Sequence, residues 1–444
     1  MKRKEFLRIG CGAGFSGDRI EPAMVLTEKG ELDYLVLECL AERTIALAQK
    51  RKLLDSTKGY DALLEKRITT LLPHLVKNNT RLITNMGAAN PVEAAKKIIE
   101  IASEQNIKIK VAAVTGDDVL DTVLNHTSNI HDLENDKPLS DYNIISANAY
   151  IGAEAIIEAL KTHANFIITG RVADPSLFLA PMIYEWDWDK NNYDLMGKGT
   201  VVGHLLECAG QVTGGYFADG VKKKVEGLHK LGHPFADIFE DGSAIISKVE
   251  GTGGVINVQT TKEQLLYEVM NPHEYFTPDV IADFTTVHLK EIGKDQVHVS
   301  GGSGKTRPAT YKTSIGYKAF YLGEGEISYA GAAAYERAQL AADALQKRLA
   351  HSFSDMRIDF IGMQSLHSTT FKYENKPYEV RLRIAAKAST PERAALIGEE
   401  VEALYTNGPA GGGGARKYVN EIIGVVSTLI PRTSITPQVN VFQS

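Results

Sequence analysis

The residue types best suited to proton transfer occur in two short segments of the chain. In "TGRVADPS", Arg171 and Asp174 fall within one loop, and in "GHLLECAG", His204 and Glu207 are spaced i and i+3 on one helix face. Together with Asp18, they supply a general acid, a general base and a cation that binds a carboxylate. A structural Arg171–Asp174 ion pair and a surface or satisfied His204–Glu207 pair are the alternatives.

Two adjacent carboxylates, Asp117 and Asp118, end a predicted strand in "VTGDD". Such a pair binds a divalent metal such as Mg²⁺, acts as a general base, or caps the next helix, and the sequence leaves all three open. Zinc is not indicated, because H-E-x-x-H is absent and the three cysteines form no C-x-x-C pair. No cofactor is firmly implied, and Mg²⁺ at Asp117 and Asp118 is the one metal candidate.

A glycine-rich turn, "GCGAGFSGDR", spans residues 10–19 and has the G-x-G-x-x-G spacing of a dinucleotide-binding loop. Glu38 follows Gly17 by 21 residues, which suits a ribose-binding acid, but Pro22 disturbs the helix start that this motif needs. An oxyanion cradle at a helix start is the favoured interpretation, with nicotinamide or flavin binding and a plain turn as alternatives. The expected oxyanion-binding residues here are Gly12, Gly14, Ser16, Gly17 and Arg19.

Further polar and glycine-rich loops follow other predicted strands. "GPAGGGGAR" at 408–416 offers a nest of backbone N–H groups or a flexible linker, and the two are equally supported. "GGSGKT" at 301–306 is not a phosphate loop, because Val299 stands where the Walker pattern needs glycine. The additional substrate-binding candidates are Asn85, Gly87, Asn90, Gly116, Arg171, Gly412, Gly413 and Arg416.

Short apolar runs alternate with helix-like segments in the first part of the chain, which is typical of an α/β domain with a largely parallel sheet. The predicted strands are 6–10, 32–38, 81–85, 109–115, 142–148 and 165–170. The carboxyl ends of parallel strands meet at one edge, so the loops described above are expected to share one site.

The later part of the chain changes character. From about 200 to 300 the pattern loosens into a loop-rich or β-rich extension of the first domain, 1–300. The second domain, 301–444, has strands at 313–321, 357–362, 378–386 and 421–429 and helices at 329–349 and 391–405. That order, βαββαβ, predicts a smaller α+β domain of ferredoxin-like type.

The composition narrows the class of partner. The chain has 444 residues and a formal net charge of −6, without a basic stripe interleaved with aromatics, which argues against nucleic acid. No apolar run is long enough for a membrane span, and the basic start lacks the apolar segment of a secretion signal. With only three cysteines, a cytoplasmic location is expected, and the size favours a homo-oligomer.

Several segments, in order, resemble the acyclic terpene utilisation family AtuA: "RIGCGAGFSGDRIEPA", "LDYLVLECLAERTIALAQ", "TNMGAANP", "VTGDD", "TGRVADPSLFLAP", "VEGTGGVINVQT" and "GPAGGGGARK". The resemblance covers about residues 5–432. It implies a cytoplasmic catabolic protein linked with the breakdown of acyl-CoA and branched carboxylic acids, and it implies no set of catalytic residues. Longer members carry an extra small α/β domain, which suggests a separate small ferredoxin-like partner subunit here.

These observations favour a hydro-lyase, a hydratase or dehydratase, that acts on a small branched or unsaturated carboxylic acid or its CoA thioester. One base removes the α-proton, one acid protonates the departing hydroxyl, and oxyanion donors hold the enolate. Asp174 and His204 are the expected base and acid, and Arg171 is the expected carboxylate clamp. The alternatives are an NAD-dependent oxidoreductase and a non-catalytic subunit that works with a small partner protein.

Overall fold

The computed structural model describes residues 5–367 and 377–444. The chain divides into two units, of which unit 1 is Met1–Gly316 with Val425–Ser444, and unit 2 is Tyr317–Gly424. The chain passes from unit 1 to unit 2 after Gly316, whereas the expected boundary was at 300/301, and it returns to unit 1 at Val425. No helix in the described ranges has the length and apolarity that crossing a membrane requires.

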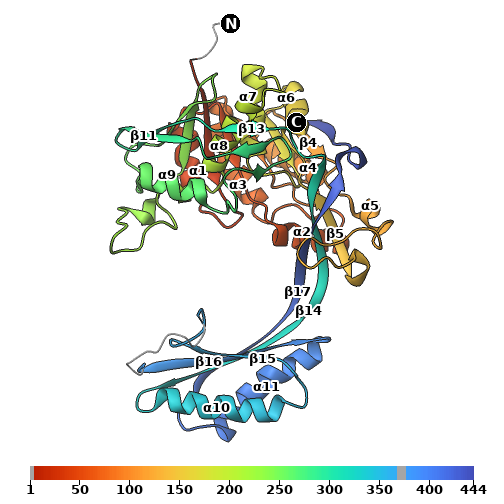
Figure 1. Ribbon diagram of the computed structural model, residues 1–444, viewed down its shortest axis with the longest axis vertical. Helices are drawn as coiled ribbons and strands as arrows, with labels where there is room; N and C mark the ends of the chain where they lie inside the picture. Colours follow the sequence, from red (N-terminus) through yellow and green to blue (C-terminus); the bar gives the residue numbers. More distant parts are fainter. Residues whose placement is uncertain (1–4, 368–376) are drawn as a thin grey trace. The chain divides into compact units, whose positions relative to one another are not determined.

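Unit 1 is built on a ten-stranded sheet in the order β11-β12-β8-β7-β1-β2-β3-β6-β4-β18 (Figure 1). Its five central strands run parallel, as the alternation of apolar runs and helices predicts. Their bounds are β1 (Leu7–Ala13), β2 (Tyr34–Leu37), β3 (Arg81–Thr84), β6 (Phe166–Thr169) and β4 (Lys110–Thr115). These runs are almost wholly buried because helices cover both faces of a parallel sheet.

The helices of unit 1 pack their apolar stripes on the sheet. Helices α1 (Glu21–Lys29), α3 (Leu64–Lys77) and α4 (Pro91–Glu104) share one core with alternate strand residues such as Leu35 and Leu82. The intervening strand residues, such as Val36, are equally buried, and α6 (Ala153–Lys161), α7 (Ser176–Trp186) and α8 (Tyr193–Glu207) contact the same strands. The period of two along each strand thus divides its side chains between two helical layers.

The remaining helical elements of unit 1 are short or lie at its edges. The α-helices are α2 (Glu42–Leu54), α5 (Leu120–Leu124) and α9 (Val258–Leu266). The 3₁₀ turns are η1 (Leu139–Asp141), η2 (Ala209–Gln211), η3 (Leu228–Lys230) and η4 (Arg432–Ser434).

The loose 200–300 region extends the same sheet with antiparallel strands. These are β7 (Pro234–Ile238), β8 (Ala244–Lys248), β11 (His288–Gly293) and β12 (Gln296–Ser300). At the opposite edge, β18 (Gln438–Gln443) pairs antiparallel with β4, a strand that the sequence did not predict. Three short strands, β9 (Tyr275–Phe276), β10 (Ile281–Asp283) and β13 (Ser303–Lys305), form a separate sheet.

One predicted member of the parallel sheet lies elsewhere. The segment at 142–148 does form a strand, β5 (Ile144–Ala149), but it pairs with β14 (Thr310–Ala330) and not with the central sheet. Sequence periodicity identifies a strand but does not choose its neighbour, which is why the prediction of six strands in one parallel sheet was wrong at this element.

Unit 2 has an antiparallel sheet in the order β15-β16-β14-β17. Unit 2 begins with the part of β14 from Tyr317 onward. It continues with α10 (Ala334–Leu349), β15 (Met356–Ile361), β16 (Glu379–Ala388), α11 (Pro391–Asn407) and the part of β17 (Gly413–Pro431) up to Gly424. Both helices lie on the same face of the sheet and share one apolar core with it (Figure 1). β14 and β17 are 21 and 19 residues long, far longer than predicted.

Candidate functional site

A cavity of about 1240 Å³ lies in unit 1 at the carboxyl ends of β1, β2 and β6. The loops after these strands line it together with the start of α2, the end of α8, Tyr150 after β5, and segments 267–278 and 308–312. Six carboxyl side chains face three cations in this lining: Asp18, Glu38, Glu42, Asp174, Glu207 and Glu268, against Arg19, Arg171 and Lys312. The cavity is therefore markedly acidic.

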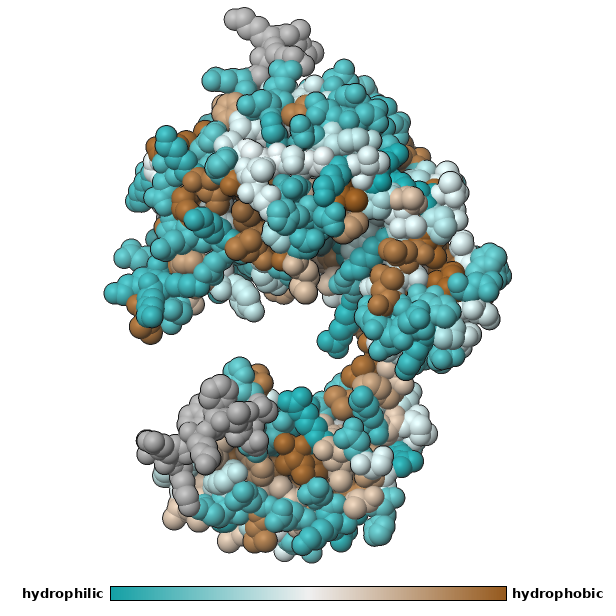
Figure 2. Space-filling model, in the orientation of Figure 1, coloured by the Kyte–Doolittle hydropathy of each residue, from teal (hydrophilic) through white to brown (hydrophobic). Residues whose placement is uncertain are grey.

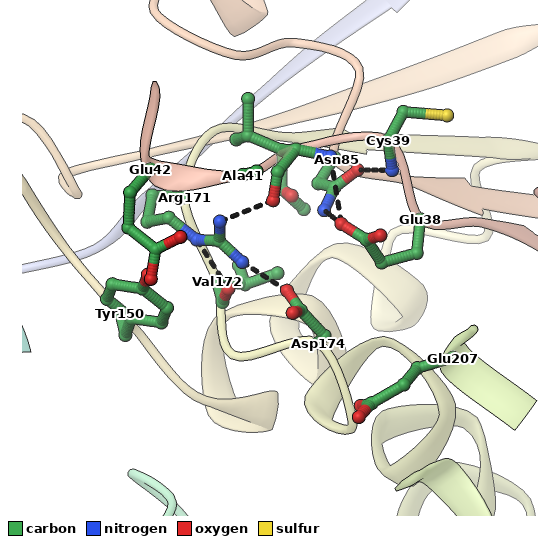
Figure 3. Close-up of polar contacts among 12 residues, drawn as sticks. Glu38, Cys39, Ala41, Glu42, Asn85, Tyr150, Arg171, Val172, Asp174 and Glu207 are labelled. Atoms are coloured by element: carbon green, nitrogen blue, oxygen red, sulfur yellow. Dashed lines mark hydrogen bonds and ion pairs between the residues drawn. The ribbon is translucent and has the colours of Figure 1, made fainter. Parts of the chain in front are cut away.

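Arg171 is the buried centre of this cluster, with 1% of its side chain exposed (Figure 3). Its guanidinium donates to the carbonyls of Leu40 (2.5 Å) and Val172 (2.9 Å) and to the carboxylate of Asp174, and lies over the Tyr150 ring at 4.3 Å. Protein groups thus use one N–H of each guanidinium nitrogen. Arg171 thus holds the loop that carries Asp174, and its role as a clamp for a substrate carboxylate stays a prediction.

Glu38 directly follows β2 and is buried near the Arg171 guanidinium. Its carboxylate accepts from the Asn85 side-chain amide (2.9 Å) and from the Leu40 N–H (2.8 Å), while the Asn85 oxygen accepts from the Cys39 N–H (2.7 Å). Burial, helped by the nearby charge of Asp174, raises the pKa of Glu38 well above its usual range. Asn85, predicted to bind substrate, is a support for Glu38 behind the cavity wall.

Three of the residues that the sequence predicted for catalysis line the cavity with a carboxyl group: Asp18, Asp174 and Glu207. Burial raises the pKa of Asp174, although the Arg171 charge opposes the rise. Burial likewise raises the pKa of Glu207 to about 7, against the opposing effect of His204. One of the Glu207 oxygens has no hydrogen-bond partner among the described residues. Glu207 can therefore carry or release a proton near neutral pH, and burial favours the protonated form of Asp174 relative to a solvated aspartate.

His204 lies behind Glu207 and does not line the cavity. Its Nδ1 is 2.7 Å from a Glu207 oxygen, and its ring packs against Tyr275 and Phe284 at 5.2 and 5.4 Å. The i, i+3 spacing in the sequence correctly placed the two side chains on one helix face. The structure makes His204 a positioning partner of Glu207 and keeps it out of reach of a ligand.

Three lining residues that the sequence analysis missed form a second polar chain. The Tyr150 hydroxyl donates to Glu42 (2.5 Å), whose carboxylate also lies 3.3 Å from Lys312 Nζ. Although burial opposes it, the Tyr150 hydroxyl and the Lys312 charge lower the pKa of Glu42 to about 2. Glu42 and Tyr150 each follow a predicted strand, and that signal could have found them. Lys312 carried no such signal.

The glycine-rich turn does not fit a dinucleotide. The Gly14 N–H donates to the Asp18 carboxylate (2.7 Å), so a negative charge occupies the position where a pyrophosphate would bind. A Cβ on Gly14 would lie 2.5 Å from the Cys208 carbonyl carbon, and one on Gly12 would lie 2.9 Å from Ala23. Glu38, the expected ribose ligand, lines the cavity, and one of its oxygens already accepts from Asn85 and Leu40. The glycines are explained by close packing of the chain itself.

Replacing Gly14 by alanine tests this packing explanation. We expect Gly14→Ala to lower the free energy of unfolding by about 1–3 kcal/mol, because the new methyl overlaps backbone atoms that cannot move aside. Gly413→Ala is the matched control, since nothing lies within 4 Å of its Cβ position. Chemical denaturation of both variants measures the effect, and equal midpoints would show that Gly14 tolerates a side chain.

Asp117 and Asp118 lie outside the cavity lining. The Asp117 carboxylate accepts from the Asn148 amide (3.0 Å) and the Arg171 N–H (2.8 Å), and burial raises its pKa to about 6. Asp118 accepts from the Leu120 N–H (3.2 Å) at the start of α5. The described chain provides no group of three or more His, Cys, Asp or Glu around a metal. These two residues do not fit a metal site by themselves, and the N-cap of α5 is Val119 and not an aspartate.

The other residues predicted to bind substrate fall into three groups. Gly14, Ser16 and Arg19 line the cavity, although Arg19 donates to the carbonyls of Leu228 (3.1 Å) and His229 (3.2 Å). Five of them lie outside the lining: Gly12, Gly17, Gly87, Asn90 and Gly116. The Asn90 side-chain amide instead donates to the backbone carbonyls of Ser56 and Lys58. Gly412, Gly413 and Arg416 belong to unit 2 and are not among the lining residues.

The outer wall of the cavity is apolar and aromatic. Phe15, Tyr216 and Phe276 are 60%, 87% and 64% exposed, and Leu133 and Leu228 also belong to the lining. In Figure 2, brown apolar patches interrupt the otherwise hydrophilic surface of unit 1. The cavity therefore combines an acidic, hydrogen-bonded end with apolar walls, the usual composition of a small-molecule site.

Comparison with known proteins gives one match. No curated protein and no solved structure matches the chain. The model of the acyclic terpene utilisation family protein AtuA matches residues 7–441, which include every residue of the cavity. The chain thus belongs to the acyclic terpene utilisation family AtuA, and its role is catabolic.

Proposed function

We propose that the protein is a hydro-lyase that adds water to, or removes it from, a small branched or unsaturated acyl group. The observation that carries the proposal is the pair of lining carboxyl groups, Asp174 and Glu207, whose pKa values are both raised by burial. Dehydration next to a carbonyl needs one group that accepts a proton and another that donates one, at the same pH. Two carboxyl groups in different environments meet that need.

The roles follow from the partners of each side chain. Asp174, held against Arg171, acts as the base that takes the proton from the carbon next to the carbonyl. Glu207 protonates the departing hydroxyl, which leaves as water while the carbon–carbon double bond forms. Lys312, whose side chain is 47% exposed at the cavity, supplies positive charge for the enolate oxygen. His204 positions Glu207 and does not itself transfer a proton to or from the substrate.

The lining suits one form of the substrate. Protein acceptors already take one N–H of each guanidinium nitrogen of Arg171, which leaves fewer of its donors for a free carboxylate. A thioester presents a neutral carbonyl to the same surroundings. The neutral thioester carbonyl and the apolar part of the lining suit a branched acyl thioester.

A thermal-shift screen of the purified protein tests the proposal. The ligands are NAD, NADP, CoA, branched and unsaturated acyl-CoAs and free unsaturated dicarboxylates, each with and without magnesium. We expect an acyl-CoA to stabilise the protein by about 2.7 kcal/mol at a hundredfold its dissociation constant. Turnover is then followed by the loss of enoyl-thioester absorbance.

Other outcomes of the screen would contradict the proposal. Stabilisation by NAD or NADP alone would support the oxidoreductase alternative and show that the glycine-rich turn binds a dinucleotide after all. Binding without turnover, restored by a small partner from the same cells, would support the non-catalytic subunit. The βαββαβ order of unit 2 and its strand order β15-β16-β14-β17 support a ferredoxin-like arrangement of that unit, which bears on this alternative.

A further inference from the structure

Three cations gather around the carboxylate of Glu154, in the first turn of α6. Lys190 Nζ and Arg307 Nη1 each lie 3.0 Å from one of its oxygens, and Arg432 Nη2 lies 3.9 Å from it. All four residues belong to unit 1. Three positive charges therefore share a single carboxylate, which cannot neutralise them.

Asp279 is a second carboxyl group close enough to act on Arg432. Its two oxygens accept from the Ala153 N–H (2.9 Å) and from the Ser176 hydroxyl (2.5 Å), so the fold itself holds this side chain. Burial raises the pKa of Asp279. Even with Asp279 ionised, the three cations outnumber the carboxylates beside them.

Arg432 is the most enclosed of the three cations, with 16% of its side chain exposed. Its guanidinium donates to the Pro278 carbonyl (2.7 Å) and lies over the Tyr311 ring at 4.1 Å. The contact with Glu154 is longer than a hydrogen bond. Burial lowers the pKa of Arg432, and the nearby charge of Arg307 lowers it further. A bound anion would offset the repulsion between the two guanidinium groups.

The cation cluster adjoins one end of a stretch of the cavity lining. Pro278, whose carbonyl accepts from Arg432, lines the cavity. Pro308 also lines it and directly follows Arg307. From Arg307 the chain reaches the cavity residue Lys312 in five steps, which span at most about 18 Å. An extended ligand can therefore contact both the cation cluster and Lys312.

We propose that Arg307, Arg432 and Lys190 bind the phosphate groups of a CoA thioester. Its pantetheine arm follows the 308–312 lining and brings the thioester carbonyl to Lys312. This assignment rests on the proposed function, in which Lys312 supplies positive charge for the enolate oxygen. Guanidinium groups match the geometry of phosphate with parallel hydrogen bonds, and phosphate brings the negative charge that the cluster lacks.

Calorimetric titration of the full-length protein with CoA and with pantetheine tests the assignment, because pantetheine lacks the nucleotide and its phosphate groups. The wild type is expected to bind CoA more tightly than pantetheine, on the order of tenfold or more. Arg307→Gln and Arg432→Gln should each weaken CoA binding about tenfold, since each removes charge-assisted hydrogen bonds to phosphate. Neither should change pantetheine binding. The Arg307 side chain is 40% exposed, so its variant keeps the test valid if Arg432→Gln fails to fold.

Lys96→Gln removes an exposed cation of α4 and is the control for net charge, with CoA affinity expected to equal that of the wild type. Circular dichroism confirms that each variant is folded. A wild type that binds CoA no better than pantetheine, or not at all, would overturn the proposal. So would unchanged CoA affinity in Arg307→Gln. If inorganic phosphate bound with a dependence on Arg307 while CoA did not bind, the phosphate would come from another source and the CoA assignment would be wrong.

These results are separable from the proposed reaction, because binding needs no turnover. A protein that binds CoA through Arg307 but neither hydrates nor dehydrates an acyl-CoA would contradict the hydro-lyase and leave this site intact. A protein that turns over acyl-pantetheine as efficiently as acyl-CoA would contradict this site and leave the hydro-lyase intact.

Discussion

Glu207→Gln is expected to abolish most of the turnover, by a factor of about 10²–10⁴, the range typical of a positioned acid or base. Glutamine keeps the size of the side chain and its contact with His204 but cannot donate or accept the proton. The wild-type rate should fall on the alkaline side with an apparent pKa near 7, since burial raises the pKa of Glu207 to about 7. Single-turnover and steady-state rates between pH 5 and 9 measure both effects.

The same variant has a stability signature that needs no substrate. The pKa of Glu207 rises on folding from 4.5 to about 7, so the folded protein binds its proton more tightly than the unfolded chain. This tighter proton binding contributes on the order of 3 kcal/mol to the free energy of unfolding. The contribution is complete below pH 4.5 and is lost as the pH rises through 7. Glutamine does not titrate, so Glu207→Gln does not lose stability in this way. The stability of the variant relative to the wild type should therefore increase as the pH rises from 4.5 to 7.

Glu158→Gln, on the exposed side of α6, is the matched control for both measurements. It removes a carboxylate that lies outside the cavity, and neither turnover nor the pH dependence of stability should change. A Glu207→Gln enzyme with wild-type turnover would remove Glu207 from the reaction. An unchanged pH dependence of stability would show that the Glu207 carboxylate is better solvated than its burial implies.

Arg171→Ala is expected to destabilise unit 1 by about 3–5 kcal/mol, the usual cost of leaving one partner of a buried ion pair alone. The change strands the Asp174 carboxylate and leaves the carbonyls of Leu40 and Val172 without their donor. It also removes the positive charge that opposes the raised pKa of Glu38. Urea denaturation gives the change in midpoint, and the loss should be smaller at pH 5 than at pH 8, where the stranded carboxylates are ionised.

Two further variants separate charge from geometry at this position. Arg171→Lys keeps the charge but not the planar fork of donors, so its stability should fall between those of the wild type and Arg171→Ala. Arg348→Ala removes an exposed arginine that pairs with Glu400, and its midpoint should equal the wild-type value. If Arg171→Ala also matched the wild type, the guanidinium would be free to bind substrate, as the sequence first suggested.

The sequence by itself determined the elements and much of the candidate site. Apolar runs located the five parallel strands of unit 1, and their shared edge put Asp18, Arg171 and Asp174 around one cavity. The i, i+3 spacing also predicted that His204 and Glu207 meet. These features depend on the spacing of apolar residues along each helix and strand and on the geometry of parallel strands. Residues that are close in the sequence specify both.

Only the tertiary structure decided what those side chains do. Arg171 takes one acceptor, the Leu40 carbonyl, from a loop 131 residues away, and this contact helps to hold its guanidinium beside Asp174. β5 does not pair with the parallel sheet, because its partner is β14, a strand that is distant in the sequence. Gly14 is needed because the backbone of Cys208 packs against it. In each case the deciding partner is distant in sequence, and no local pattern encodes which distant segment will arrive.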